Sequence, residues 1–210
     1  MFIGFHHEMA YRKEFASKVL FFCLEPPPEG GETSIVLSHV IVKKMEEAMP
    51  EFVAKLMKFG VVIRQITPKE STSEKAPRKT WQQLLQTKDK AEAIKLAQLK
   101  TGCNSLNFLE DGAAEFIFGP LNPIRKIKGR RVWFNTIVGY SGKLDDMSVS
   151  FGDGSPCPAD ALTTYPKILD DNHVNICWQK GDILLEDNLC VQHSRRPGRP
   201  PRVILVSLCK

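Results

Sequence analysis

Two of the five histidines in the sequence lie where they can share a metal ion with a carboxylate. Residues 5–9 read Phe-His-His-Glu-Met, so His6 and Glu8 are two positions apart. Residues i and i+2 of a strand point to the same face, which would set this imidazole and this carboxylate side by side. His193, expected just past a strand, is a third potential ligand. Two histidines and one carboxylate that leave three adjacent metal positions open are the arrangement of non-heme Fe(II) oxygenases.

The remaining histidines have simpler interpretations. A His-x-Glu pair arises often by chance, so its spacing alone is weak evidence for a site. His7 should face away from His6 if the segment is extended. His39, near an expected helix start, and His173, in an Asp-Asp-Asn-His run, are interpreted as surface residues.

A group of arginines follows His193 closely. Arginine is the residue best suited to bidentate recognition of a carboxylate, such as the far carboxylate of a 2-oxo dicarboxylic acid. We expect most of the group to lie in a solvated basic loop and Arg202, which opens the last expected strand, to point inward. Nucleic-acid binding by residues 195–202 is a weaker hypothesis, because no aromatic residues for base stacking are interleaved there.

The composition suits one globular domain of 210 residues. Lys and Arg number 29 against 24 Asp and Glu, and 42% of the residues are hydrophobic, which excludes a disordered or strongly polyanion-binding chain. The longest apolar run, residues 19–24, is far shorter than a membrane span, and we expect no secretory signal. The six cysteines form no CxxC pair and three lie in apolar surroundings, which predicts a reducing compartment and a cytoplasmic protein.

Strand signals dominate the elements that must position these residues. A helical region with an N-cap at Ser38 is expected up to Gly60, with a possible break at Pro50, and two further helices at 89–100 and 159–169. Residues 68–88 suit an irregular surface excursion. Strands are expected at 18–24, 33–37, 60–67, 105–109, 114–118, 131–138, 174–178, 183–186 and 203–208. This order predicts a mainly β fold, a sandwich or jelly-roll barrel with helical insertions.

Six segments, in order along the chain, resemble the plant clavaminate synthase-like proteins of the taurine dioxygenase (TauD/TfdA-like) superfamily. They are residues 5–9, 29–33, 133–135, 151–156, 178–182 and 193–196. The resemblance implies a double-stranded β-helix (jelly-roll) core with His6, Glu8 and His193 as catalytic iron ligands. It also implies that Thr33 and Arg202 bind the cosubstrate 2-oxoglutarate.

The chain departs from the family pattern at three places. The second arginine that some relatives carry four residues after Arg202 is Val206 here, and Pro197-Gly198 stands where an aromatic residue is common. The family also carries about a hundred residues, a large part of a normal domain, ahead of the His-x-Glu motif. We therefore expect residues 1–210 to be one N-terminally shortened domain, the C-terminal two thirds of a larger one, with an incomplete jelly roll.

The resemblance implies a dioxygenase that uses Fe(II), 2-oxoglutarate and O2 to hydroxylate or otherwise oxidise a small organic substrate, with release of succinate and CO2. No nucleic acid or membrane partner is expected. The alternative is a truncated, non-catalytic fragment that acts as a binding or regulatory module. Trp133, Phe134 and Asn135 are interpreted equally well as pocket residues or as core residues.

Overall fold

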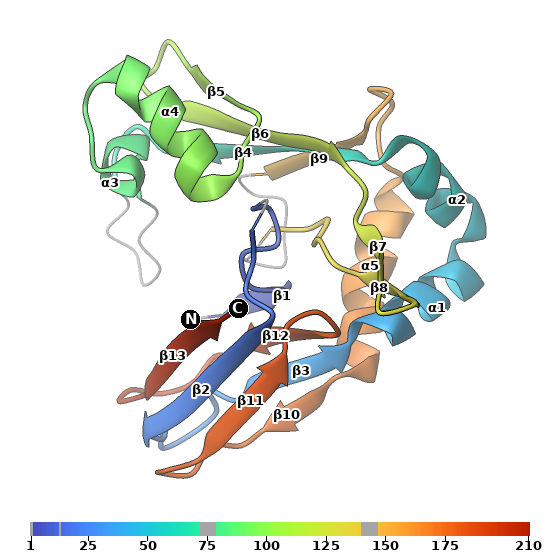
Figure 1. Cartoon of the computed structure of the whole chain (residues 1–210), viewed down its shortest axis with the longest axis vertical. Coiled ribbons are helices and arrows are strands. Elements are labelled where there is room, and N and C mark those ends of the chain that lie inside the picture. Colours follow the sequence, from blue (N-terminus) through green and yellow to red (C-terminus); the bar gives the residue numbers. More distant parts are fainter. Residues whose placement is uncertain (1, 13, 72–78, 140–146) are drawn as a thin grey trace.

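The computed structural model describes residues 2–12, 14–71, 79–139 and 147–210. Its strands form two sheet assemblies, a small barrel-like pair of sheets and a second sheet flanked by helices (Figure 1). The expected mainly β fold is confirmed.

The barrel-like part contains two facing antiparallel sheets. The first has the order β1 (Ile3–His6), β12 (Val191–Arg195), β3 (Thr33–Leu37) and β10 (Val174–Ile176). The second has the order β11 (Ile183–Asp187), β2 (Lys18–Glu25) and β13 (Val203–Cys209). Every pairing among these strands is antiparallel, as in a jelly roll.

Buried and partly exposed side chains alternate along β2, and this pattern shows which face of the strand packs against the other sheet. Val19, Phe21 and Cys23 are buried and form a small core with Trp178, while Leu20 and Phe22 face the other side. Period-2 burial of this kind is what a half-buried strand requires. The interior of the barrel therefore lies on the Val19–Phe21–Cys23 side of β2.

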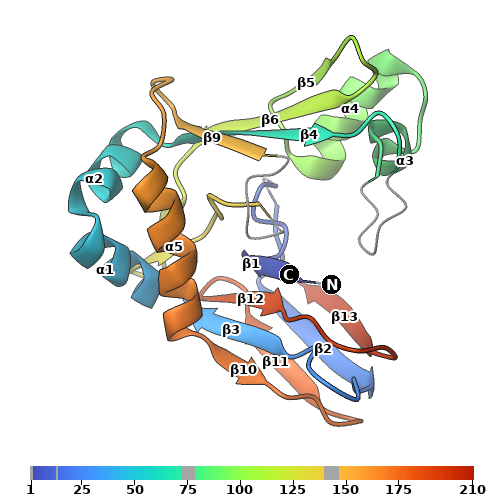
Figure 2. The same ribbon diagram turned by 180° about the vertical axis from the view of Figure 1, so that it is seen from behind.

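The main hydrophobic core lies mostly in the second assembly and its helices, and it also includes Phe5 of β1 and Val36 of β3. The sheet of the second assembly has the order β5 (Ser105–Phe108), β6 (Ala114–Leu121), β4 (Val61–Thr67) and β9 (Met147–Phe151), and a hairpin joins β7 (Ile124–Ile127) to β8 (Arg130–Trp133). The helices are α1 (Ser38–Ala48), α2 (Pro50–Phe59), α3 (Trp81–Leu85), α4 (Lys90–Thr101) and α5 (Ala159–Asn172). Figure 2 shows α1 and α5 side by side between the two assemblies, where α1 also packs on β8.

The long helical region breaks at Pro50, as the sequence suggests. Helix α1 ends at Ala48, and Pro50 is the first residue of α2, where proline is well tolerated. The prediction of Ser38 as an N-cap is wrong, because Leu37 occupies that position and the Ser38 hydroxyl bonds His7 instead.

Several other expectations need correction. The expected strand at 131–138 ends at Trp133, and the short strands β7 and β9 were not expected. The irregular stretch contains helix α3, which begins with a capping box between Thr80 and Gln83. His193 lies within β12 rather than just past a strand.

Among the described residues, no helix combines the length and apolar character needed to cross a membrane. All six cysteines are free thiols. Cys23, Cys103 and Cys157 are buried, Cys190 is partly buried, and Cys177 and Cys209 are exposed.

Candidate metal centre

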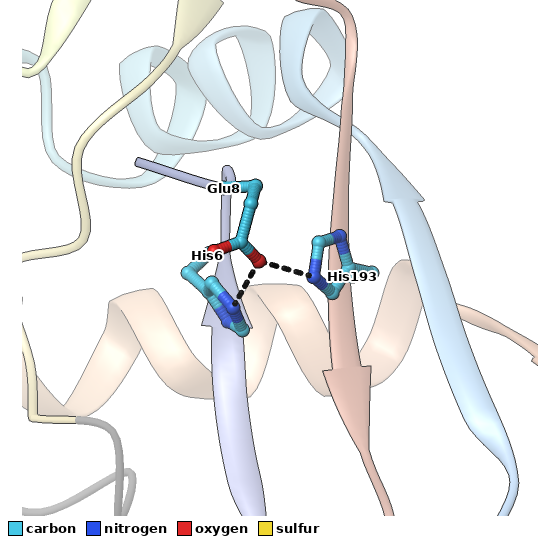
Figure 3. A group of neighbouring side chains, drawn as sticks. All are labelled: His6, Glu8 and His193. Carbon is cyan, nitrogen blue, oxygen red and sulfur yellow. Dashed lines mark ion pairs between the residues drawn. The ribbon is translucent and has the colours of Figure 1, made fainter. Parts of the chain in front are cut away.

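The structure brings His6, Glu8 and His193 together on the interior side of the first sheet (Figure 3). The Glu8 carboxylate lies between the two imidazoles, with Oε2 3.8 Å from His6 Nε2 and 3.6 Å from His193 Nε2. One potential ligand atom of each residue lies within 4.8 Å of the other two. The three residues singled out in the sequence therefore form one cluster.

The two histidines meet because their strands are paired. His6 and His193 are direct partners in the β1–β12 register, and directly opposed side chains share a face. Glu8 reaches the site differently from the expectation, since β1 ends at His6 and Glu8 lies in the following turn. Met9 has a left-handed backbone (φ 59°), which marks the sharp change of chain direction after Glu8.

Asn188 holds the turn that carries Glu8. Its side-chain oxygen accepts a hydrogen bond from Glu8 N (2.7 Å), and its amide nitrogen donates to the backbone oxygens of Glu8 (3.0 Å) and Ala16 (2.7 Å). Asn188 is completely buried. Sequence reasoning missed this residue, because its partners lie near the opposite end of the chain.

Glu186 orients His193. It is buried, and its Oε1 lies 3.0 Å from His193 Nδ1, so that the other ring nitrogen, Nε2, faces Glu8. His6 is oriented similarly, with Nδ1 2.8 Å from the carbonyl oxygen of Gly4. A carboxylate behind a ligating histidine fixes the ring and makes it a better metal ligand. Glu186 is thus a second residue that the sequence did not reveal.

The electrostatics of the cluster favour a positive charge between these side chains. Hydrogen bonds to His193 and then His6 hold the pKa of Glu8 well below its usual range. Burial opposes charge on His193, but Glu186 and Glu8 outweigh it and raise the pKa of His193 to about 9. A divalent cation bound among these groups would supply the same positive charge.

The donor set fits a divalent metal ion. Ligand atoms about 2.1 Å from an ion and at right angles to each other are about 3 Å apart, slightly closer than the nitrogen–oxygen distances seen here. Small side-chain rotations would close that difference. Two imidazole nitrogens and one carboxylate oxygen on one side of an ion form the facial triad of non-heme iron sites.

His7 supports the site from behind. It is buried, stacks on Phe134 with 4.5 Å between ring centroids, and has its Nδ1 2.6 Å from Asn188 O. Burial lowers the pKa of His7 to about 4, so the ring is neutral at pH 7. Nδ1–H then donates to Asn188 O, and Nε2 accepts from the Ser38 hydroxyl at 2.7 Å. As expected, His7 points away from the triad.

Thr33 and Arg202 also lie together, on the same interior. Arg202 Nη2 donates to Thr33 Oγ1 (3.3 Å), Arg202 Nε donates to Gly31 O (2.7 Å), and Trp178 Nε1 donates to Thr33 Oγ1 (3.1 Å). Burial, together with the charge of Arg195, lowers the pKa of Arg202 to about 10. Ile35 is the partner of His193 in the sheet, and Thr33 is two residues from Ile35 on the same strand. Thr33, with Arg202 beside it, therefore lies roughly 6.6 Å along the sheet from His193.

The Gly30-Gly31 turn explains the shape of the loop after His193. Gly31 N donates to Pro197 O (2.8 Å), and Gly30 forms an isolated bridge with Gly198. Gly31 has a φ of +70°, and a Cβ there would lie 3.1 Å from Arg202 Cδ. These glycines therefore leave room for the Arg202 side chain. The backbone of Pro197-Gly198 packs directly against the backbone of Gly30-Gly31.

A cavity of about 320 Å³ opens beside Glu8, between the turn after β1 and the second sheet. Its lining includes the rings of Tyr11 and Phe118, whose centroids are 5.0 Å apart. Two cationic side chains, Arg12 and Lys100, also line it, and Glu8 is the one acidic residue among its described lining. A small molecule in this cavity would lie against Glu8, the member of the triad that lines it.

Trp133, Phe134 and Asn135 are core residues, all completely buried. Trp133 stacks on Tyr165 (4.9 Å between centroids), and Asn135 Nδ2 donates to Ala10 O at 2.9 Å. They back the site and are not among the described residues that line the cavity. His173, expected at the surface, is half-buried beside Arg196.

The sequence and the fold are similar to those of known oxygenases. A model of the family described as "Taurine catabolism dioxygenase TauD, TfdA family" matches residues 2–208. A clavaminate synthase-like protein of Arabidopsis thaliana is 41% identical over 216 residues, which cover 99% of this chain and 65% of the relative. The dapdiamide synthesis protein DdaC of Enterobacter agglomerans is 22% identical over 98% of this chain and 65% of its own length. The chain thus spans 65% of the length of each of these relatives.

Solved structures share the fold at low sequence identity. An asparagine oxygenase in complex with Fe(II), 2S,3S-3-hydroxyasparagine and succinate has a TM-score of 0.56 and 14% identity, with 100% of this chain and 50% of that chain covered. A taurine dioxygenase from Burkholderia xenovorans has a TM-score of 0.51 and 12% identity, with 98% and 56% covered. These similarities confirm the expected jelly-roll type of fold.

Proposed function

Because the chain belongs to the taurine catabolism dioxygenase TauD, TfdA family, we propose that it is an Fe(II)- and 2-oxoglutarate-dependent dioxygenase. It would oxidise a small organic substrate with O2 and release succinate and CO2. The observation that carries this proposal is the cluster of His6, Glu8 and His193, whose ligand atoms lie within 4.8 Å of one another.

Each residue of the cluster has a defined task in this proposal. Nε2 of His6, Nε2 of His193 and the carboxylate of Glu8 hold the iron. Glu186 keeps the His193 ring in the ligating orientation, and Asn188 keeps the Glu8 turn in place. When bound, iron and 2-oxoglutarate together supply the oxidative chemistry, and the protein supplies their positions.

Thr33 and Arg202 are assigned to the distal carboxylate of 2-oxoglutarate. Thr33 lies two residues along the sheet from the His193–Ile35 pair. This spacing is comparable to the length of a five-carbon dicarboxylate. A molecule chelated at the triad would therefore reach the Arg202 guanidinium with its far end.

The cavity beside Glu8 is assigned to the substrate. A volume of about 320 Å³ is at the small end of ligand pockets, which favours a small molecule. Arg12 and Lys100 favour a substrate with an anionic group, and the Tyr11–Phe118 pair favours an apolar portion beside it. Small organic acids, each compared with its neutral amide, are the first substrates to screen for succinate release.

Anaerobic spectroscopy tests the proposal without knowledge of the substrate. Addition of Fe(II) and 2-oxoglutarate should produce a weak visible charge-transfer band that requires both components. The Glu8→Ala variant should lose the band, whereas Glu47→Ala, an exposed change on α1, should keep it. No band from folded protein would contradict the proposal. Iron binding with succinate formation would exclude the non-catalytic alternative.

A further inference from the structure

Arg195 differs from the other arginines that follow His193. Arg196 pairs with Asp170 (2.8 Å) on the outer side of the sheet, and Arg199 is exposed and pairs with Glu29 (2.9 Å). Among the described residues, no carboxylate forms an ion pair with Arg195. The expectation of one solvated basic loop is therefore wrong for this residue, which belongs to β12.

The register of the sheet places the Arg195 side chain inside the barrel. Arg195 is the direct partner of Thr33 in the β12–β3 pairing, and opposed side chains share a face. Arg195 is also two residues after His193 on the same strand, so alternation gives it the face of that ligand. The side chain therefore lies beside Thr33, on the side where Arg202 reaches in.

The Arg195 guanidinium has an unmet demand for an acceptor. Its Nε is buried and has no hydrogen-bond partner among the described residues. Arg202 is near enough for the charge of Arg195 to contribute to its lowered pKa, and it too lacks a carboxylate partner among the described residues. Two neighbouring cations that are partly buried, together with a buried N–H group that has no acceptor, cost folding free energy unless an anion binds between them.

Thr33 adds a third donor to the same place. Its hydroxyl oxygen accepts hydrogen bonds from Trp178 Nε1 (3.1 Å) and Arg202 Nη2 (3.3 Å). Both lone pairs are then occupied, so the hydroxyl hydrogen must be donated to another group. Trp178 thereby positions the Thr33 hydroxyl as a donor. The O–H of Thr33 and the guanidinium groups form a donor-rich pocket.

We propose that Arg195 is a second guanidinium contact for the distal carboxylate of 2-oxoglutarate, beside Arg202 and Thr33. This inference rests on the proposed function. A carboxylate has about four acceptor positions, enough for two guanidinium groups and one hydroxyl. Arg195 supplies from β12 the second cation that β13 lacks, because the residue four positions after Arg202 is Val206. The pocket should then select for a 2-oxo acid with a second carboxylate.

Binding measurements with the Mn(II)-loaded protein test this without turnover. Calorimetry would give the dissociation constants of 2-oxoglutarate and of 2-oxobutyrate, which lacks the distal carboxylate, for the parent, Arg195→Gln, Arg202→Gln and, as matched control, Arg199→Gln. Arg195→Gln should weaken 2-oxoglutarate binding by about 10- to 100-fold, the usual effect of one charged hydrogen bond. Its 2-oxobutyrate affinity should stay unchanged, and Arg199→Gln should bind both acids as the parent does.

The thermal unfolding of the metal-free variants separates binding from support of the fold. Loss of a cation that faces another cation should leave the midpoint of Arg195→Gln unchanged or raised, whereas a structural arginine would lower it. Unchanged 2-oxoglutarate binding in Arg195→Gln, with weakened binding in Arg202→Gln, would overturn the inference and leave the proposed function standing. Unchanged binding in both variants would contradict the proposed cosubstrate site itself.

Discussion

Glu186 is a buried carboxylate with one satisfied oxygen. Its Oε1 bonds His193, and its Oε2 is buried without a hydrogen-bond partner among the described residues. A buried charge of this kind is costly unless a positive group balances it. The raised pKa of His193, about 9, lets its protonated ring provide that balance, and a metal ion bound to the ring would take over the same role.

Glu186→Gln should weaken metal binding by about 10- to 100-fold, the range found for groups that support a ligand. Glutamine keeps the size of the side chain but loses the negative charge that makes His193 a better ligand. Calorimetric titration with Mn(II) would measure the affinity. Glu29→Gln, at an exposed ion pair, is the control, and equal affinities in the two variants would contradict the role of Glu186.

Asn188→Ala should lower the free energy of unfolding by roughly 3 kcal/mol, because several buried backbone groups lose their partners at once. The variant should also bind Mn(II) more weakly, since the Glu8 turn is no longer fixed. Urea denaturation and metal titration would measure the two effects. A stability equal to that of the parent would show that this turn does not depend on Asn188.

At the scale of elements, the turn between β2 and β3 determines where Arg202 can lie. Gly31→Ala should destabilise the fold by about 1–2 kcal/mol, because φ is +70° and the new Cβ would crowd Arg202 Cδ. It should also raise the dissociation constant for 2-oxoglutarate. Gly129→Ala, also at a positive φ but with no atom within 4 Å of the new Cβ, separates backbone strain from crowding. Equal 2-oxoglutarate affinity in both variants would remove the link between this turn and the cosubstrate.

Strands with a clear apolar pattern were predictable, including β3 with Thr33, whereas β12, which carries His193, was not. β2 alternates buried and partly exposed apolar residues and ends before three prolines, so its position follows from the sequence. β12 contains Gln192, His193 and Ser194, which are all buried and polar. The alternation of apolar residues that predicts other strands is therefore absent from it. The burial of these side chains depends on hydrogen bonds with distant segments, such as Gln192 to Trp133 O.

The candidate site shows the same division. The residues of the triad have recognisable types and spacing, and all of them meet in the structure. Glu186 and Asn188 lie at the end of a short apolar run, in the polar triplet 186–188, which has no distinctive pattern. Their roles depend on the approach of two chain ends, which local sequence patterns do not encode.

At the scale of the whole molecule, the three-stranded sheet exposes apolar residues on its outer face. Phe22 of β2 is flanked by Ile183 on β11 and Leu205 on β13, which are 66% and 51% exposed. On β13 the next residue, Val206, points the opposite way and is also exposed. A long apolar strand at a sheet edge is a template for association with other chains.

Leu205→Lys should therefore reduce self-association and improve solubility, because an edge lysine opposes strand pairing. Sedimentation velocity over a concentration series would measure the effect. Leu99→Lys on α4 is the control, since that leucine is exposed but lies on a helix away from this sheet. Equal improvement in both variants would mean that the edge has no special part in association.

The pairing of β1 with β12 also has a consequence for protein synthesis. One imidazole of the triad belongs to the first described strand and the other to the last described strand but one. During synthesis His6 must wait for His193 until nearly all of the described residues have been added. The complete metal site therefore forms only after the residues between these two strands have been synthesised.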